Sequence, residues 1–249
     1  WKVKQAFALD ADRQSRALLA AALRRGAGAA PVPAELDVFN TASWERTGLV
    51  TLSREQSGAG DRVVDDRGKP VPSQRLSTGE LVFLARNVPP FAARRFRVEA
   101  GPAPAQGAAK AEAAALSHPE FKVRIDERTG GIASLFSRDL NHEWVDAKAA
   151  IALNDYFYLP GADLKGLQRN GAPRITVKER GPLVASLLIE SDAPGCKRLQ
   201  REVRVVDGLD CVEIINTVDK LAVRAKEGVH FGFGFNVPDG TVRLDVGWA

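Results

Sequence analysis

The feature that most constrains this fold is a long succession of short alternating strands, separated by turns and not by helices, that runs from Ser117 to the end of the chain. In FKVRIDERTGGIASLFS, two alternating segments flank the turn DERTGG and predict a hairpin. Regular β spacing without intervening helices favours a sandwich of antiparallel sheets over an α/β fold. Short strand patterns from Glu35 onward, with turn residues at DDRGKP and STGE, predict a second and smaller antiparallel sandwich.

Two other segments have different patterns. Residues 3–25 carry an apolar stripe that includes Val3, Phe7 and Leu18, and this predicts a helix that stops at Gly26. Residues 101–116 are rich in Pro, Gly and Ala, which predicts a linker, with a short helix as the alternative. We therefore expect a mainly β chain in four parts: 1–30 with the helix and a connector, 31–100 as a small β domain, 101–116 as a linker, and 117–249 as a large β region.

Composition excludes several classes of partner. The net charge is only +4, and the basic residues are scattered without a run of five like charges, so we expect no nucleic acid and no anionic membrane as partner. No apolar run is long enough to span a membrane. Cys196 and Cys211 have no metal-type spacing and could form a disulfide or remain free thiols. The chain has no methionine and starts at Trp1 within a helical pattern, so we expect a fragment of a longer protein.

The residues alone indicate no catalytic site. The three histidines, His118, His142 and His230, lie far apart in sequence, and their flanking residues form no zinc-binding pattern. There is no nucleophile elbow, no phosphate-binding loop and no dinucleotide fingerprint. One stretch, ALNDYFYLPGAD, is unusual because it holds both tyrosines of the chain beside amide and carboxylate groups. Such residues on a loop are suited to binding sugars, whereas the alternative is a hairpin end whose tyrosines cover the core.

Six segments in order resemble the C-terminal half of the family 38 glycoside hydrolases, the α-mannosidases. The resemblance runs from about Val38 to the last residues and is carried by VFNTASWERTGLV, FKVRIDERTGGIASLFS, LNDYFYLPG, RGPLVASLLIESDAPG, LDCVEIINTVDK and KEGVHFGFGFNVP. It implies that residues 1–30 end a helical bundle and that residues 117–249 form the first part of a galactose-mutarotase-like β supersandwich. It also implies that Asn154, Asp155 and Tyr156 are candidates for contacting the sugar.

The resemblance implies retaining hydrolysis of terminal α-mannosides, with an aspartate nucleophile and a zinc ion held by two His and two Asp residues. Those residues belong to an N-terminal catalytic domain, so none is assigned in this chain. We therefore expect this part to support the missing catalytic domain, to be inactive alone and to bind no zinc itself. Assembly into a homo-oligomer is compatible with the sequence. The alternative is a stand-alone carbohydrate-binding or scaffold module. An independent mutarotase, using His230 and Glu227, is a third hypothesis.

The segment KEGVHFGFGF predicts one strand with two unlike faces. With period two, Val229, Phe231, Phe233 and Phe235 share a face that we expect in the core. His230 shares the other face with glycines, which let another group approach closely. Lys226 and Glu227, at the entry of the strand, are expected to pair locally and not to act as acid and base.

Overall fold

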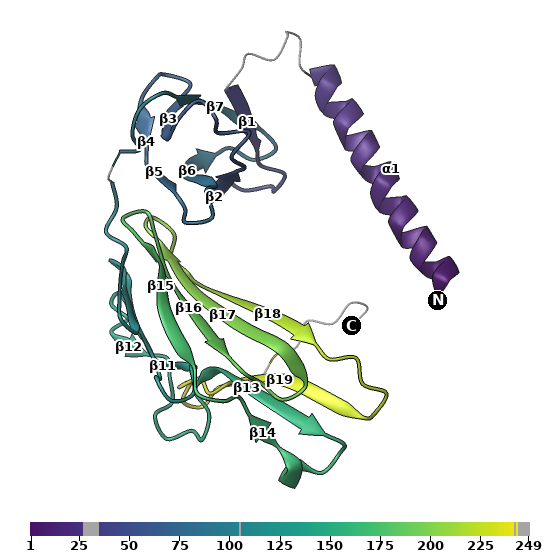
Figure 1. Cartoon of the computed structure of the whole chain (residues 1–249). Helices are drawn as coiled ribbons and strands as arrows, with labels where there is room; N and C mark the ends of the chain where they lie inside the picture. The colour runs from purple at the N-terminus through teal and green to yellow at the C-terminus, as the bar shows by residue number, and fades with distance from the viewer. Residues whose placement is uncertain (27–34, 105, 242, 244–249) are drawn as a thin grey trace.

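The computed structural model describes residues 1–26, 35–104, 106–241 and 243. It has one N-terminal helix followed by several antiparallel sheets, so the predicted mainly β fold class is confirmed (Figure 1). The helix α1 (Lys2–Gly26) ends at the predicted glycine. From Trp1 through Ala22 every residue is exposed, including Phe7 and Leu18 of the predicted apolar stripe. The boundary that we predicted near residue 30 lies outside the described residues, and the division into domains stays a prediction.

A first β unit follows the helix and consists of two small antiparallel sheets with strand orders β1-β7-β3-β4 and β2-β6-β5. The sheets pack face to face over one apolar core, in which the rings of Phe83 and Phe96 lie 4.9 Å apart. The strands are β1 (Glu35–Phe39), β2 (Arg46–Leu52), β3 (Arg62–Asp65), β4 (Pro70–Val71), β5 (Ser73–Arg75), β6 (Leu81–Val88) and β7 (Ala93–Glu99).

A second β unit is a larger sandwich of two antiparallel sheets. One sheet has the order β14-β13-β11-β10-β9-β8, with β12 paired to β11 and β19 to β13, and the other has the order β15-β16-β17-β18. Its strands are β8 (Lys110–Glu112), β9 (Ala115–Ser117), β10 (Phe121–Ile125), β11 (Ile132–Ser137), β12 (His142–Glu143), β13 (Leu153–Pro160), β14 (Gln168–Arg169), β15 (Arg174–Arg180), β16 (Val184–Ser191), β17 (Cys196–Val206), β18 (Val212–Lys220) and β19 (Glu227–Phe233). A short 3-10 helix, η1 (Leu164–Gly166), precedes β14.

The sandwich core shows why this sequence folds into two layers. Ile125 and Ile132 from the first sheet and Leu187 and Val203 from the second are each at most 1% exposed and belong to one apolar cluster. Figure 1 shows the two sheets as separate layers. The predicted hairpin is confirmed, because β10 and β11 pair antiparallel across the DERTGG turn. That turn is closed by the Asp126 carboxylate, which accepts hydrogen bonds from the backbone N–H groups of Arg128 and Thr129.

The predicted linker differs from the structure in its second half. Residues 110–112 and 115–117 form the antiparallel pair β8–β9, and β9 also pairs with β10. Ala109, Ala111 and Leu116 are buried in the sandwich core. Small alanine side chains fit beneath the opposing sheet, but they carry neither the β-branched nor the aromatic signal from which a strand is predicted.

The two β units are joined by an apolar and hydrogen-bonded interface. Leu84 of the first unit packs with Leu183 and Val184 of the second, and all three are fully buried. Gln74 on β5 bonds the backbone at the N-terminal end of β16: its Oε1 accepts from the N–H groups of Leu183 and Val184, and its Nε2 donates to Val184 O, each at 3.0 Å. The buried Glu179 carboxylate accepts hydrogen bonds from both N and Oγ of Ser77. These contacts make the two units one continuous body.

Candidate functional site

The stretch that we predicted as a sugar-binding loop is a strand. Residues 153–160 form β13, which pairs with β19 along its whole length, so the loop prediction is wrong for these residues. Asn and Asp are depleted in strands, but here Asn154 sits at an irregularity in the pairing with a φ of 63°, a conformation that asparagine tolerates. The bulge places Asn154, Asp155 and Tyr156 inside the sandwich, where each is at most 2% exposed.

Asn154 forms a reciprocal amide pair with Asn216 on β18. Its Nδ2 donates to Asn216 Oδ1 at 2.9 Å, and Asn216 Nδ2 donates back to Asn154 Oδ1 at 2.8 Å. Because β13 and β18 belong to different sheets, this pair links the two layers through polar groups. Both donors and acceptors are used within the protein, so the pair stabilises the sandwich.

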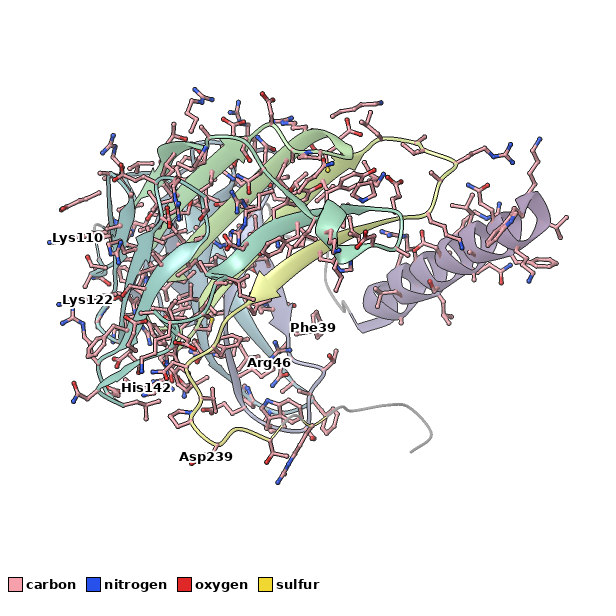
Figure 2. All side chains as sticks on the ribbon, turned by 90° about the horizontal axis from the view of Figure 1, so that it is seen from below. Phe39, Arg46, Lys110, Lys122, His142 and Asp239 are labelled. Atoms are coloured by element: carbon pink, nitrogen blue, oxygen red, sulfur yellow. The ribbon has the colours of Figure 1, made fainter. Side chains whose placement is uncertain are left out.

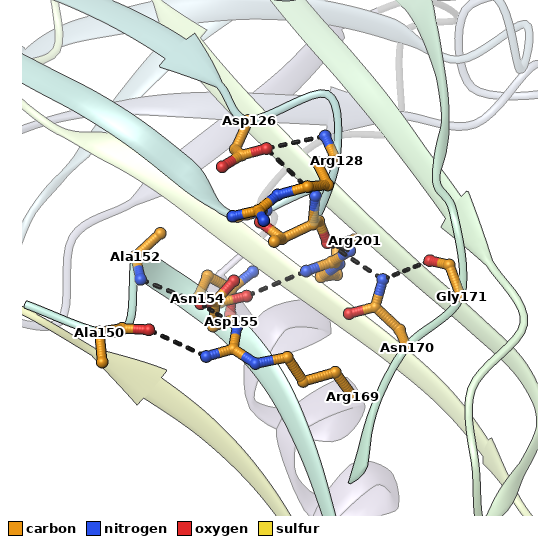
Figure 3. Close-up of polar contacts among 12 residues, drawn as sticks. Asp126, Arg128, Ala150, Ala152, Asn154, Asp155, Arg169, Asn170, Gly171 and Arg201 are labelled. Carbon is orange, nitrogen blue, oxygen red and sulfur yellow. Dashed lines mark hydrogen bonds and ion pairs between the residues drawn. The ribbon is translucent and has the colours of Figure 1, made fainter.

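Asp155 is a buried carboxylate with one satisfied and one unsatisfied oxygen (Figure 3). Its Oδ2 accepts hydrogen bonds at 3.0 Å from Ala152 N and from Arg169 Nη1. Arg169 also donates to Ala150 O and lies 4.6 Å above the centre of the Phe157 ring, so this arginine covers the carboxylate from the outer side. Asp155 Oδ1 has no hydrogen-bond partner among the described residues.

Arg201 on β17 is the charged group on the inner side of the same cluster, and it is fully buried. Its Nη1 donates to Asn154 O at 3.2 Å and its Nη2 to Thr129 O at 2.7 Å, while Nε has no partner within the described part of the chain. Burial lowers the pKa of Arg201 to about 10, against the opposing charge of Asp155, so the guanidinium remains charged at neutral pH. A side chain at Gly130 would collide with Arg201, and one at Gly131 would come within 2.6 Å of Asp155 Oδ1. The two glycines of the DERTGG turn thus make room for this buried pair.

Arg201 is absent from the predicted site residues, although the sequence carries a signal for it. Leu199, Val203 and Val205 alternate on the buried face of β17, and Arg201 is the one charged residue within that apolar series. A charge at a core position requires a partner inside the protein, because burying an unpaired charge is very costly.

Tyr156 and Tyr158 bridge β13 to the other sheet and to β19. The Tyr156 hydroxyl donates to Pro194 O and lies 3.1 Å from Cys196 Sγ, and burial followed by the contact with Cys196 raises the pKa of Tyr156 well above its ordinary value. Tyr156 therefore covers the core, as the second interpretation of this stretch predicts. The Tyr158 hydroxyl donates to Glu227 Oε2 at 2.6 Å. Cys196 and Cys211 are both free thiols.

Strand β19 agrees only in part with the predicted faces. Phe231 is half-buried and packs edge-on against Tyr156, but Phe233 and Phe235 are exposed and stack on each other, so the prediction of four core residues is wrong for these two. Among the described strands β19 pairs with β13 alone, so it lies at an edge of its sheet. Gly232 does permit a close approach, because a side chain there would lie 2.9 Å from the Phe157 ring.

The charged residues of β19 are not arranged as a catalytic pair. Glu227 bonds Lys220 and Tyr158 and not Lys226, so the predicted local pair is wrong. His230 is exposed and lies opposite Phe157 in the ladder, an odd number of residues from Glu227 and hence on the other face of the strand. The strand does not bring the two residues together for mutarotase chemistry.

Three comparisons place this geometry among known proteins. No protein-family model matches the sequence, and no curated protein matches it. Among solved structures, an α-mannosidase from Enterococcus faecalis V583 superimposes with a TM-score of 0.53 and 13% sequence identity, over 76% of this chain and 30% of that chain. The fold resembles part of that α-mannosidase. At this identity the likeness shows the fold alone, and the chain spans less than a third of the mannosidase that it matches.

The β13 cluster is built to hold the sandwich together. The side-chain groups of Asn154, Asp155 and Tyr156 bond other protein groups or are closed off from solvent, so sugar contact by these residues stays a prediction that their burial does not favour. In the described ranges no three His, Cys, Asp or Glu side chains converge as a metal site would require, so the residues present do not fit zinc. No helix in that same part of the chain is long and apolar enough to cross a membrane.

Two open hollows lie elsewhere on the surface. One of about 330 Å³ lies on the outer face of β8, β9 and β10, where Lys110, Lys122 and Arg124 line it. Figure 2 shows Lys110 and Lys122 on the same side of the molecule. The other, of about 430 Å³, lies in the first β unit and is lined by Lys69, Arg86 and Arg94. None of the predicted sugar-binding residues lines either hollow.

Proposed function

We propose that this chain is the C-terminal β region of a retaining α-mannosidase, and that it supports a catalytic domain that hydrolyses terminal α-mannosides. The observation that carries the proposal is the structural likeness to part of the Enterococcus faecalis α-mannosidase, which extends over 76% of this chain. The ordered sequence segments that resemble the family support it independently. The nucleophilic aspartate and the zinc ligands are proposed to belong to the catalytic domain, because the residues described here do not fit a zinc site.

The contacts of this chain suit a rigid support. Buried apolar residues and the hydrogen bonds of Gln74 and Glu179 hold the two β units in one orientation. Within the larger unit, the Asn154–Asn216 pair and the buried Arg201 link the two sheets. A support of this kind holds the elements of a neighbouring domain in a fixed geometry, and catalysis depends on such geometry to within about 0.5 Å.

The proposal is tested by an activity assay of the chain together with the reading frame of its gene. We expect the purified chain of 249 residues to show no turnover of an aryl α-mannoside with zinc present. We also expect the gene to encode, upstream of Trp1, a domain that carries an H-x-D zinc motif. Clear zinc-dependent turnover by the chain alone would overturn the claim that catalysis lies elsewhere, and an open reading frame that begins near Trp1 would overturn the assignment to a longer mannosidase.

A stand-alone carbohydrate-binding module is the second candidate, and one observation favours it. Phe39, at the end of β1, and Trp44 and Phe91, on two adjoining loops, are each more than half exposed, and Phe91 N donates to Ala42 O between the loops. Exposed aromatic rings serve as platforms for sugar rings. In affinity electrophoresis through a mannan gel, this candidate predicts retardation that Trp44→Ala abolishes. Unretarded migration of the wild-type chain would eliminate it.

A further inference from the structure

A hollow of about 430 Å³ lies in the first β unit, next to Gln106 of the segment that leads to the second unit, and it is the strongest candidate for a ligand site outside the polar core. Its floor is apolar and includes the buried residues Leu84 and Phe96, and its rim carries three cationic side chains. Ligand pockets typically measure about 300–1,000 Å³. We propose that Lys69, Arg86 and Arg94 bind the phosphate group of a small molecule in this hollow.

Arg94 is already held in one orientation. Its Nη1 donates to Arg86 O at 2.7 Å, and its guanidinium carbon lies 5.9 Å from the centre of the Phe96 ring. Its Nη2 is 4.0 Å from the carboxylates of both Asp65 and Asp66, which is too far for a hydrogen bond. In the described part of the chain, Nη2 and Nε therefore have no acceptor. A fixed guanidinium with unused donors is suited to an oxyanion, which it can bind by two parallel hydrogen bonds.

Arg86 is positioned by the second β unit. Gly208, in the turn between β17 and β18, has a φ of 84°, and a side chain there would lie 2.6 Å from Arg86 Nη2 and 2.8 Å from Leu84 Cδ2. The absence of a side chain at Gly208 thus lets the arginine lie against the turn. No ion pair or side-chain hydrogen bond of Arg86 occurs within the described residues. Its positive charge is available to a ligand.

The charge balance of the hollow favours an anion. Lys69 forms no ion pair with any described residue, and Asp65 is the one acidic side chain among the lining residues. The Oδ1 of Asp65 is occupied by the backbone N–H groups of Arg67 and Lys69, so this carboxylate is engaged with its own turn. Together with Asp66, which lies outside the lining but 4.0 Å from Arg94, two carboxylates face three cations, so the hollow keeps a net positive charge that suits the oxygens of a phosphate group. The apolar floor would contact the organic part of the ester.

Binding to the full chain tests this site directly and independently of mannosidase activity. The chain is titrated at low ionic strength with inorganic phosphate, with a hexose 6-phosphate and with the unphosphorylated hexose, by calorimetry and by ¹⁵N NMR. We expect both phosphate compounds to bind and to shift the backbone signals of residues 69–71, 86 and 94, and we expect the free hexose to do neither. Tighter binding of the ester than of inorganic phosphate would identify a phosphorylated small molecule as the ligand, and equal binding would identify phosphate itself.

Matched variants distinguish phosphate binding at this specific site from general electrostatic attraction to a basic protein. Arg86→Gln and Lys69→Gln remove exposed side chains whose loss leaves the fold intact, and together they should weaken phosphate binding by about tenfold or more. Arg95→Gln and Arg97→Gln make the same charge change on β7 but remove arginines that pair with Asp37 and Glu99, and binding should be retained. No phosphate binding by the wild-type chain, or an equal loss in both pairs of variants, would overturn the proposal.

Discussion

Replacing Arg201 by methionine tests whether the buried polar cluster stabilises the sandwich. Methionine keeps most of the length of the side chain but removes the charge and both hydrogen bonds, to Asn154 O and Thr129 O. Burial lowers the pKa of Arg201 to about 10, although the charge of Asp155 opposes this shift. At about 1.4 kcal/mol per pKa unit, the variant therefore regains roughly 3 kcal/mol, which is the desolvation cost net of the attraction to Asp155.

The losses in the variant are larger than this gain. Two hydrogen bonds from a charged donor contribute about 1.5–3 kcal/mol each, and the Asn154 carbonyl, which loses Arg201, costs about 1–3 kcal/mol, whereas Thr129 O keeps Asn170 Nδ2 as a donor. Asp155 also loses its inner counter-charge, although Arg169 remains on the outer side. We expect a net loss of about 2–4 kcal/mol, close to the effect of removing one partner from a buried ion pair.

Urea unfolding followed by circular dichroism measures this loss as a shift of the midpoint at constant slope. Arg198→Met is the matched control, because Arg198 lies on the same strand, its side chain is 62% exposed, and its nearest carboxylate is 3.8 Å away. The control should change stability by less than about 0.5 kcal/mol. An Arg201→Met protein as stable as the wild type would refute the reasoning, since it would show that desolvation outweighs the hydrogen bonds.

Three further predictions follow from other contacts. Gln74→Ala leaves the N–H groups of Leu183 and Val184 and the carbonyl of Val184 without their partner, and it should cost about 2–4 kcal/mol in urea unfolding; a loss below about 0.5 kcal/mol would contradict the role of this interface. Gly131→Ala places a methyl group 2.6 Å from Asp155 Oδ1 and should lower the unfolding midpoint, whereas Gly48→Ala, with nothing within 4 Å, should not; equal effects would refute the steric reasoning. Burial lowers the pKa of His118 below 6.5, so protonation of this histidine favours the unfolded state. The neutral histidine contributes its full stabilisation above about pH 6.5, and this stabilisation is lost as the pH falls through the pKa of the folded state. The unfolding midpoint should therefore decrease between about pH 7 and pH 5 in the wild type and less in His118→Asn, and identical pH profiles would contradict this.

Local sequence signals predicted the helix, the hairpin and the mainly β class. Each depends on residues close together in the chain: the apolar stripe that ends at Gly26, and the alternation on both sides of the DERTGG turn, where Asp126 closes the turn by itself. These signals are strong because the residues that interact within each element are neighbours in both the sequence and the structure.

The remaining features depend on partners far away in sequence. The residues Asn154, Asp155 and Pro160 predict a loop at β13, whereas the strand is stabilised by β19 and by Asn216, 62 residues away from Asn154. Ala109 and Ala111, at β8, have no strand signal of their own and are ordered by the core in which they are buried. Arg201 could have been noticed as a charge within an apolar face, but its partners at Thr129 and Asn154 come from other strands and turns.

The most direct test of the proposed role is complementation of a catalytic domain by this chain. The proposed catalytic domain is produced separately, and hydrolysis of a fluorogenic α-mannoside is measured with zinc, with and without the chain of 249 residues. A supporting role predicts that each part alone is inactive or nearly so and that mixing the two restores turnover, with less restoration by Gln74→Ala, in which the interface between the β units is weakened. Full activity of the upstream domain by itself, unchanged on addition of this chain, would contradict the proposal.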